Sequence, residues 1–560
     1  MLFDRREKYI GVEYSKRLNL CCDVVGPQQE NTRACKQGCR FAFLELMRND
    51  ASVWRVALFL TFAAGVHSQT RAAPATLDFV AETPDHQPVL DLRADEIVLK
   101  EDGVVQPLKG FGAPTGSELQ TRRPKSAHGE GAMAVLLDAS SFLASTMMRP
   151  APGSPPGPGS HVSLNSHAEA VKSTAISLVK NLSIESPVAV YVSNLDLRII
   201  QDFADRPDSS AIVKNSSANV NKALSVFDKM PILNPTKIHS IRITGAEEFE
   251  LAQIESIADH MANLPGRKAV IWYCDGVQPG PKFLDRINSS RDAWISMLTA
   301  LQRTGTSLYS INCFGQGMGG AWTPPRFGTF DSLNLPPPGR KFKQESMGTR
   351  VAQLAGLTGG RYYHDYDLLS DAVHDALRDG RCSYEVSWQA TNAANADPAH
   401  RIEMICKRKG VQLLYPHLYL DYALSPDEAS RLKAVERGLV TPLDMNAIPL
   451  AVQLRSDGDG ATLASVQFNA GSLPLRVQDG KARDLLDLVF AFYDAAGNRM
   501  EQGKHSTIRL ALAPEDVSSF RQKEHSLQQQ LSVPKEAKKL RVVLRDATSG
   551  AMGSAMLPLP

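Results

Sequence analysis

The sequence predicts a doubly wound α/β domain with a mostly parallel sheet, flanked by small all-β domains. Near-continuous apolar runs of strand length indicate strands that are buried on both faces, as in a parallel sheet. These runs are AMAVLLD (132–138), SPVAVYVSN (186–194), KAVIWYCD (268–275) and TSLYSINCF (306–314). Segments with apolar residues at three- and four-residue steps separate them. This alternation of strand and helix is typical of the doubly wound class.

Amphipathic segments predict the helices of this domain. They span 167–182, 248–264, 291–304, 349–360 and 367–380. The domain is therefore placed at 131–420, with Pro- and Gly-rich insertions at 149–160 and 315–341. Both insertions leave the carboxyl ends of predicted strands, and open α/β sheets bind their ligands at that edge.

Alternating apolar patterns predict β structure on both sides of the α/β domain. Residues 76–112 alternate around the turn at Glu101-Asp102-Gly103 and predict a small N-terminal β domain. Polar segments at 113–130 and 421–439 are interpreted as linkers. Residues 440–560 predict a C-terminal β-sandwich of the immunoglobulin-like kind.

An export signal is predicted near the start of the chain. Basic Arg48 and Arg55 precede an apolar stretch at 56–66, and small residues follow with a candidate cleavage point after Ser68. This stretch is too short to span a bilayer, which takes roughly twenty residues. A signal peptide at 47–68 predicts a periplasmic, cell-surface or secreted protein with no transmembrane segment in the mature chain; a buried helix or membrane anchor is the alternative. Since a signal peptide begins a protein, residues 1–46 are interpreted as a wrongly assigned leader.

Composition narrows the classes of function. A length of 560 residues predicts three or four domains. The formal net charge of +2 does not indicate a nucleic-acid partner. The spacings of the eight cysteines do not match a zinc pattern.

Four of the cysteines lie outside the leader. Cys274 and Cys313 fall in apolar runs and are predicted to be buried thiols. Cys382 and Cys406 lie in two strand-like segments that could form a hairpin. An oxidising compartment permits a disulfide between them, and the sequence leaves it open.

Two predicted parallel strands end in a carboxylate, at Asp138 and Asp275. If the strands are neighbours, both side chains reach one crevice, where a cation, water or a raised pKa would relieve their repulsion. The hydroxyls of Ser140 and Thr244 could join them. Oxygen ligands of this kind suit Mg²⁺ or Ca²⁺ rather than zinc.

The order of several motifs carries a family resemblance. The segments are QPVLDLRADEIVLKEDGVVQPLKGF, AVLLDASS, NLPGRKAVIWYCDG, LAGLTGGRYYHDYDLLSDAV and SYEVSW, and LRVVLRDATSGAMGS near the end. Residues 130–420 resemble a von Willebrand factor type A (VWA) domain, which is Rossmann-like. More closely, residues 76–420 resemble the acidobacterial VWA-related exported proteins.

The resemblance implies a metal-ion-dependent adhesion site. In VWA domains a D-x-S-x-S loop, a threonine and a second aspartate hold the ion. Asp138 and Ser140 match the first and third loop positions, and Asp275 matches the second aspartate. Thr244 matches the threonine by spacing only. Phe142 stands where the last hydroxyl belongs, so the resemblance implies a degenerate site that binds Mg²⁺ or another divalent cation weakly. The alternative is a metal-free acidic edge that caps helix N-termini.

The function implied is protein–protein interaction or adhesion without catalysis. A VWA domain docks a protein partner, here unidentified, at the carboxyl edge of its sheet. The sequence lacks G-x-S-x-G, H-E-x-x-H and Walker motifs. The alternative is a Mg²⁺-dependent enzyme that uses Asp138 and Asp275, which also needs a base or a cationic clamp. The basic segment LPGRK (264–268) is interpreted as a turn, with Arg267 at an anion site as the alternative.

Overall fold

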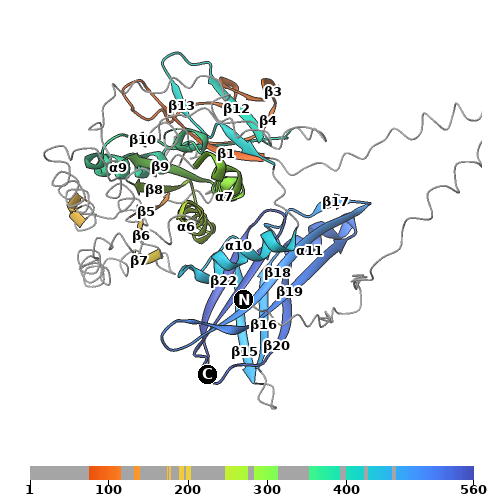
Figure 1. The fold of residues 1–560 in the computed structure, drawn as a ribbon. Coiled ribbons are helices and arrows are strands. Elements are labelled where there is room, and N and C mark those ends of the chain that lie inside the picture. Colours follow the sequence, from red (N-terminus) through yellow and green to blue (C-terminus); the bar gives the residue numbers. More distant parts are fainter. Residues whose placement is uncertain are drawn as a thin grey trace, which may run out of the picture.

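The computed structural model describes a defined part of the chain. It covers residues 75–114, 131–138, 173–174, 176–177, 188–193, 197–203, 246–274, 283–312, 352, 354–390, 399–421, 427–456 and 462–559. The predicted leader and signal peptide, the two insertions and most of the first linker lie outside the described residues. Figure 1 shows the described elements in an upper body, which contains the α/β sheet, and a lower body of long strands.

A six-stranded sheet in the order β10-β9-β8-β5-β6-β7 forms the centre of the α/β part. Its strands are β5 (Ala132–Asp138), β6 (Val188–Ser193), β7 (Leu197–Gln201), β8 (Lys268–Cys274), β9 (Thr306–Asn312) and β10 (Tyr362–Tyr363). The neighbours are parallel except for β6 and β7. The four apolar runs are strands β5, β6, β8 and β9, as predicted. The mostly parallel α/β sheet is therefore confirmed.

Helices cover both faces of this sheet. They are α6 (Ala246–His260), α7 (Phe283–Arg303) and α9 (Leu369–Arg381). Side chains of α6 and α7 share one core with Leu136 and Trp272. Side chains of α9 share the other core with Val135 and Ile271. Successive residues of a strand point to opposite faces, so each buried strand supplies both cores.

The N-terminal strands form two four-stranded sheets with strands that follow the α/β part. One sheet has the order β13-β1-β11-β4 and the other β14-β12-β2-β3. The strands are β1 (Ala75–Glu82), β2 (Ile97–Glu101), β3 (Val104–Gln106), β4 (Leu108–Gly112), β11 (Ser383–Trp388), β12 (Ala399–Cys406), β13 (Gln412–Leu414) and β14 (Leu418–Leu420). Both sheets contribute to one core, in which the rings of Phe79 and Tyr384 stack with centroids 5.0 Å apart. We call this unit the split sandwich.

The split sandwich changes the expected domain boundaries. Residues 383–420 were assigned to the α/β domain, but their strands pair with the 76–112 segment. The hairpin expected around Cys382 and Cys406 does not form, because β11 and β12 belong to different sheets. Both cysteines are free thiols. The N-terminal strands therefore do not complete a domain on their own; they need the strands beyond the α/β part.

The lower body in Figure 1 is a C-terminal sandwich. Its elements are α10 (Glu428–Val440), β15 (Leu450–Ser456), β16 (Thr462–Asn469), β17 (Arg476–Gln478), β18 (Lys481–Tyr493), β19 (Arg499–Leu512), α11 (Val517–Gln522), β20 (Glu524–Leu531), β21 (Lys539–Asp546) and β22 (Met552–Pro558). A three-stranded and a five-stranded antiparallel sheet share its core.

Helix α10 occupies most of the segment predicted as the second linker, 421–439. Its N-cap is Asp427, whose carboxylate accepts a hydrogen bond from the Ser430 amide at 3.0 Å. Ala434, Val435 and Leu439 pack against the five-stranded sheet. The linker prediction is therefore corrected: most of this segment is a helix with a buried apolar face.

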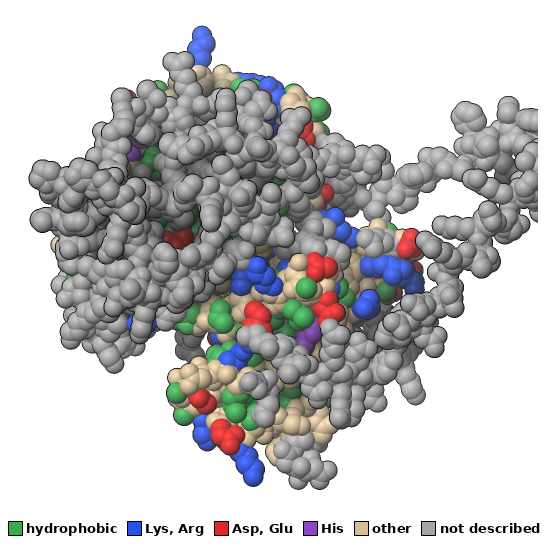
Figure 2. All heavy atoms as spheres, viewed as in Figure 1, with side chains coloured by type: hydrophobic (Ala, Val, Ile, Leu, Met, Phe, Trp, Pro, Cys, Tyr) green, Lys and Arg blue, Asp and Glu red, His purple; other side chains and the backbone are tan. Residues whose placement is uncertain are grey.

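Charge is mixed on the surface. In Figure 2, cationic and acidic side chains of the described residues lie interspersed where the upper body meets the C-terminal sandwich. Among the described helices, none is long and apolar enough to cross a bilayer.

Candidate functional site

The order of the six-stranded sheet places a topological switch point between β5 and β8. From β5 the chain builds outward through β6 to β7, and it then returns to β8, which lies on the other side of β5. Where the order reverses in this way, the crevice outside the carboxyl ends of the two central strands binds ligands in open α/β sheets. Asp138 is the last residue of β5 and therefore lies at this crevice.

The carboxylate of Asp138 is fully buried and is held by the neighbouring strand. Trp272 of β8 donates its indole N–H to Asp138 Oδ2 at 3.1 Å. Leu136 and Trp272 are partners in the parallel register, and alternation turns Asp138 to the same face as both, toward α6 and α7. A buried indole N–H and a buried carboxylate each need a partner, so this hydrogen bond fixes the orientation of both side chains.

The strands that precede Asp138 and Asp275 are neighbours in the sheet. β5 and β8 pair along their length, with Leu137 opposite Tyr273, and β8 ends at Cys274, one residue before Asp275. The side chains of Asp275, Ser140 and Thr244, and that of Phe142, lie outside the described residues. Of the four predicted ligands, the structure thus places Asp138 at the switch point.

A divalent cation was predicted at this edge. Among the described residues, no three His, Cys, Asp or Glu side chains are grouped so that they could hold a metal ion. The Asp138 carboxylate is an oxygen ligand of the kind that Mg²⁺ prefers. The Trp272 indole already takes up one acceptor position of its Oδ2 atom. This arrangement fits both roles of the carboxylate: fixing the local structure at this edge through a hydrogen bond, and serving as one ligand of a divalent cation.

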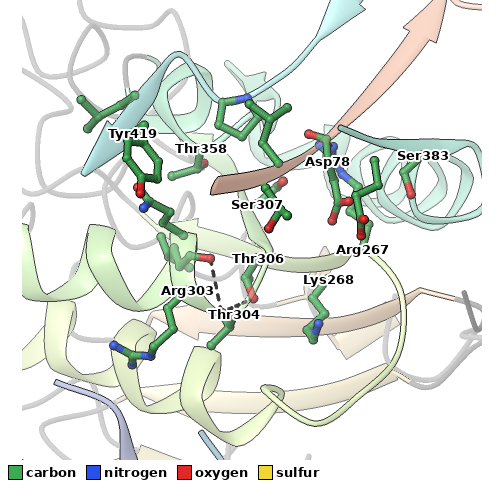
Figure 3. Close-up of a pocket in the computed structure, with 18 of the residues that line it drawn as sticks. Asp78, Arg267, Lys268, Arg303, Thr304, Thr306, Ser307, Thr358, Ser383 and Tyr419 are labelled. Carbon is green, nitrogen blue, oxygen red and sulfur yellow. Dashed lines mark hydrogen bonds between the residues drawn. The ribbon is translucent and has the colours of Figure 1, made fainter. Parts of the chain in front are cut away.

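A cavity of ≈350 Å³ lies at the opposite, amino edge of the same sheet (Figure 3). Lys268 and Thr306, the first residues of β8 and β9, are partners in the register and line it from below. Strands β1, β11 and β14 of the split sandwich supply the other walls. The cavity therefore lies between two structural units and is distinct from the switch point.

Sequence reasoning missed two residues that shape these sites. Trp272 stands in an apolar run and reads as an ordinary core residue, although its register partner lies two residues before Asp138. In the sequence, Lys268 looks like the first residue of a strand. It lines a site because the split sandwich covers that edge of the sheet. The adjacent Arg267 was the available signal for the second of these sites, since an anion site at Arg267 was the alternative to a simple turn.

No family model and no curated protein matches the chain. Among solved structures, the chain is similar to an aerotolerance-related membrane protein from Bacteroides fragilis, with 11% identity over 44% of this chain and 98% of that chain and a TM-score of 0.23. It is also similar to proximal thread matrix protein 1 of the mussel byssus, whose MIDAS motif is occupied by zinc. That match has 12% identity over 47% of this chain and 48% of that chain and a TM-score of 0.21. TM-scores this low carry no argument, so the fold assignment rests on the sheet topology.

Proposed function

We propose that the protein is an exported, non-enzymatic interaction protein that docks a protein partner at the carboxyl edge of its six-stranded sheet. The observation that carries this proposal is the placement of Asp138 at the switch point between β5 and β8. The resemblance of 130–420 to VWA domains supports it, since that family uses the same edge. The antiparallel edge strand β7 beside a parallel sheet is compatible with this resemblance.

The proposed adhesion site is degenerate. Phe142 replaces one hydroxyl, and Asp138 is tied to Trp272. Phe142 supplies no oxygen ligand, and the hydrogen bond from Trp272 occupies part of the Asp138 carboxylate. Both features weaken the site for Mg²⁺, which requires six oxygen ligands. We therefore expect a weak cation site, made by Asp138, Ser140, Thr244 and Asp275, which contributes modestly to docking.

Isothermal titration tests the cation site. Wild type, Asp275→Ala and Phe142→Ser are titrated with Mg²⁺, Mn²⁺ and Ca²⁺, with the exposed Asp85→Asn as the matched control. We expect weak binding in wild type and in the control, loss in Asp275→Ala and a gain in Phe142→Ser. Equal heats in wild type and Asp275→Ala, together with no gain in Phe142→Ser, would remove the metal from the proposal.

A second measurement tests docking itself. Immobilised wild type, Asp275→Ala and Asp85→Asn are compared for capture of envelope proteins, with and without a chelator. Docking at the carboxyl edge predicts that at least one protein is retained by wild type and Asp85→Asn and lost with Asp275→Ala. Capture that is identical in all three would place the interaction on another face. Turnover of a phosphate ester that depends on Mg²⁺ and on Asp275 would instead support the enzymatic alternative.

A further inference from the structure

The cavity at the amino edge contains two consecutive cationic side chains that are almost completely buried. Arg267 is 3% exposed and Lys268 is 7% exposed. Figure 3 shows both among the residues that line the cavity, with Asp78 near Arg267 and Thr306 near Lys268. A cation in this position has lost most of its hydration and needs replacement partners.

The hydrogen bonds of these two cations go to neutral backbone oxygens. Arg267 donates from Nη1 to the carbonyl of Asp78 at 3.3 Å and from Nη2 to the carbonyl of Gly359. Lys268 donates from Nζ to the carbonyl of Gly266 at 3.1 Å. Carbonyl dipoles replace part of the lost hydration, but they do not neutralise the charge.

The nearby carboxylates are largely committed to other partners. Asp379 attracts Arg267 electrostatically, yet it already accepts hydrogen bonds from Arg361 and Tyr309. Asp78 has further contacts and acts on Lys268 by Coulombic attraction. Burial lowers the pKa of Lys268, and the attraction of Asp78 offsets this only in part. The two cations therefore leave positive charge in the cavity.

The charge of the whole lining agrees with this. Its cationic members are Arg267, Lys268, Arg303 and Arg381, and its acidic members are Asp78 and Glu385. Arg303 is neutralised outside the cavity by an ion pair with Asp259. Of the remaining five, Arg381 and Glu385 are exposed, which leaves the buried Arg267 and Lys268 with Asp78 in the interior. The interior therefore carries an excess of positive charge, so an anion is favoured over a cation or a neutral molecule of the same shape.

The uncharged part of the lining combines apolar and hydroxyl side chains. Leu298 and Leu301 of α7 face the cavity on one side, and Leu418 and Leu420 of β14 on another. Hydroxyl groups also line the cavity, including that of Thr306, whose Oγ1 shares a hydrogen bond with Thr304 Oγ1 at 2.8 Å. A volume of ≈350 Å³ falls at the lower end of the range for small-molecule sites, roughly 300–1,000 Å³.

We propose that this cavity binds a small organic carboxylate with an apolar body. The carboxylate lies against the Lys268 ammonium and close to the Arg267 guanidinium. The apolar body packs on the leucines of α7 and β14. The site is independent of the proposed docking edge, because it lies at the other end of the sheet. Its walls come from two units, so a bound ligand also joins the α/β part to the split sandwich.

Three probes of one size test this in the full-length protein: hexanoate, hexan-1-ol and hexylammonium. Isothermal titration is expected to detect hexanoate, to give an affinity at least about tenfold weaker for hexan-1-ol, and to give no binding for hexylammonium. Equal affinity for hexanoate and hexan-1-ol would mean an apolar hole without an anion site. Absence of hexanoate binding would overturn the proposal.

Variants locate the binding. Lys268→Met removes the charge but keeps an apolar stem, and it is expected to weaken hexanoate about tenfold while hexan-1-ol is unchanged. Lys409→Met, at an exposed position, is the matched control and should change neither. Leu418→Trp, which fills the apolar end, should weaken both probes, with near-ultraviolet circular dichroism as the check on folding. Hexanoate binding that survives both cavity variants would place the site elsewhere.

Discussion

The α/β part meets its two neighbours through very different interfaces. Toward the split sandwich, Arg361 bridges Glu82 of β1 and Asp379 of α9. Its Nη2 lies 2.7 Å from Glu82 Oε2 and its Nε 2.8 Å from Asp379 Oδ2. Tyr309 donates a further hydrogen bond to Asp379 at 2.7 Å. Arg378 adds a second cation, with its Nη2 3.3 Å from Asp379 Oδ1. The two cations and two carboxylates of this cluster, which we call the Arg361 bridge, compensate one another.

Toward the C-terminal sandwich the polar groups are incompletely matched. His260 of α6 contacts Asp202 through Nε2 at 2.9 Å and the carbonyl of Asp444 through Nδ1. Arg303 of α7 donates to the carbonyl of Ser549 at 2.6 Å. Nearby, buried atoms such as Nε and Nη1 of Arg545 have no hydrogen-bond partner among the described residues. Buried polar groups without a hydrogen bond cost free energy. Each polar contact at this interface is therefore expected to stabilise it less than at the interface with the split sandwich.

The pKa values show what the difference means. Burial raises the pKa of Asp379 and of Glu82, but hydrogen bonds and attraction from Arg361 outweigh it, and both end below their usual values. In contrast, burial raises the pKa of Asp259 to about 6, despite the attraction of Arg303. One interface is therefore permanently charged near neutral pH, whereas groups at the other change their protonation there.

Breaking the Arg361 bridge should have the largest effect. Arg361→Met leaves Glu82 and Asp379 buried with Arg378, whose Nη2 lies 3.3 Å from Asp379 Oδ1 and 4.0 Å from Glu82 Oε2, as their remaining shared ion-pair partner. It is expected to lower the free energy of unfolding by about 3–5 kcal/mol. Arg93→Met is the control, since Arg93 and Asp95 form an exposed pair whose loss should cost at most about 0.5 kcal/mol. Urea unfolding at pH 7 measures both. Similar losses in the two variants would contradict the assignment of the bridge as a major tie.

Removing the imidazole at the second interface should have a smaller, pH-dependent effect. Burial lowers the pKa of His260, but hydrogen bonding and attraction from Asp202 outweigh it, so the pKa is raised. The stabilisation is then complete below the unfolded value of about 6.5 and is lost as pH rises through the folded pKa. At the acid end it persists until Asp202, whose pKa is lowered, becomes protonated.

The variant His260→Phe is therefore expected to lose about 1–3 kcal/mol at pH 5.5 and less at pH 8.5. His374→Phe, at an exposed position of α9, controls for the substitution. Unfolding titrations across this pH range provide the measurement. A loss that does not change with pH would show that His260 acts through packing alone.

The smallest effect is expected at a carboxyl pair beside the same interface. Burial and repulsion from Asp546 raise the pKa of Asp484 to about 7. Between about pH 4 and pH 7 the folded protein keeps a proton that the unfolded chain releases, so stability falls as pH rises. Asp484→Asn should remove this slope and gain on the order of 1 kcal/mol at pH 8. Unfolding at pH 5 and pH 8 is compared with the exposed Asp479→Asn; equal slopes in wild type and Asp484→Asn would refute it.

Local sequence patterns were sufficient for the centre of the fold. Strands buried on both faces leave apolar runs, which is why β5, β6, β8 and β9 could be predicted within a few residues. The split sandwich could not be predicted in this way, because β1 pairs with β11 across about 300 residues and a local pattern does not record a partner. For α10, the N-cap Asp427 and the spacing of Val435 and Leu439 were readable signals, although the segment 421–439 was interpreted as a linker.

The candidate site was predictable in the same uneven way. Asp138 was identified because an acid at the end of an apolar run is unusual, and the sheet order then gave it a position. The indole of Trp272 was hidden within its run, since the sequence does not state which strands are neighbours. The amino-edge cavity depends on two units coming together. Arg267 and Lys268 were visible, but their burial follows from tertiary structure alone.

The split sandwich also has a consequence for synthesis. Strand β11 begins about 270 residues after β4 ends, so the four N-terminal strands are synthesised long before their partners. At a synthesis rate of ~5–20 residues per second, this delay is roughly 15–55 s. During it, β1 to β4 present unpaired edges, which are prone to pair with other chains. The α/β part is complete before the partners emerge, so it can fold first and bring the two halves of the sandwich together.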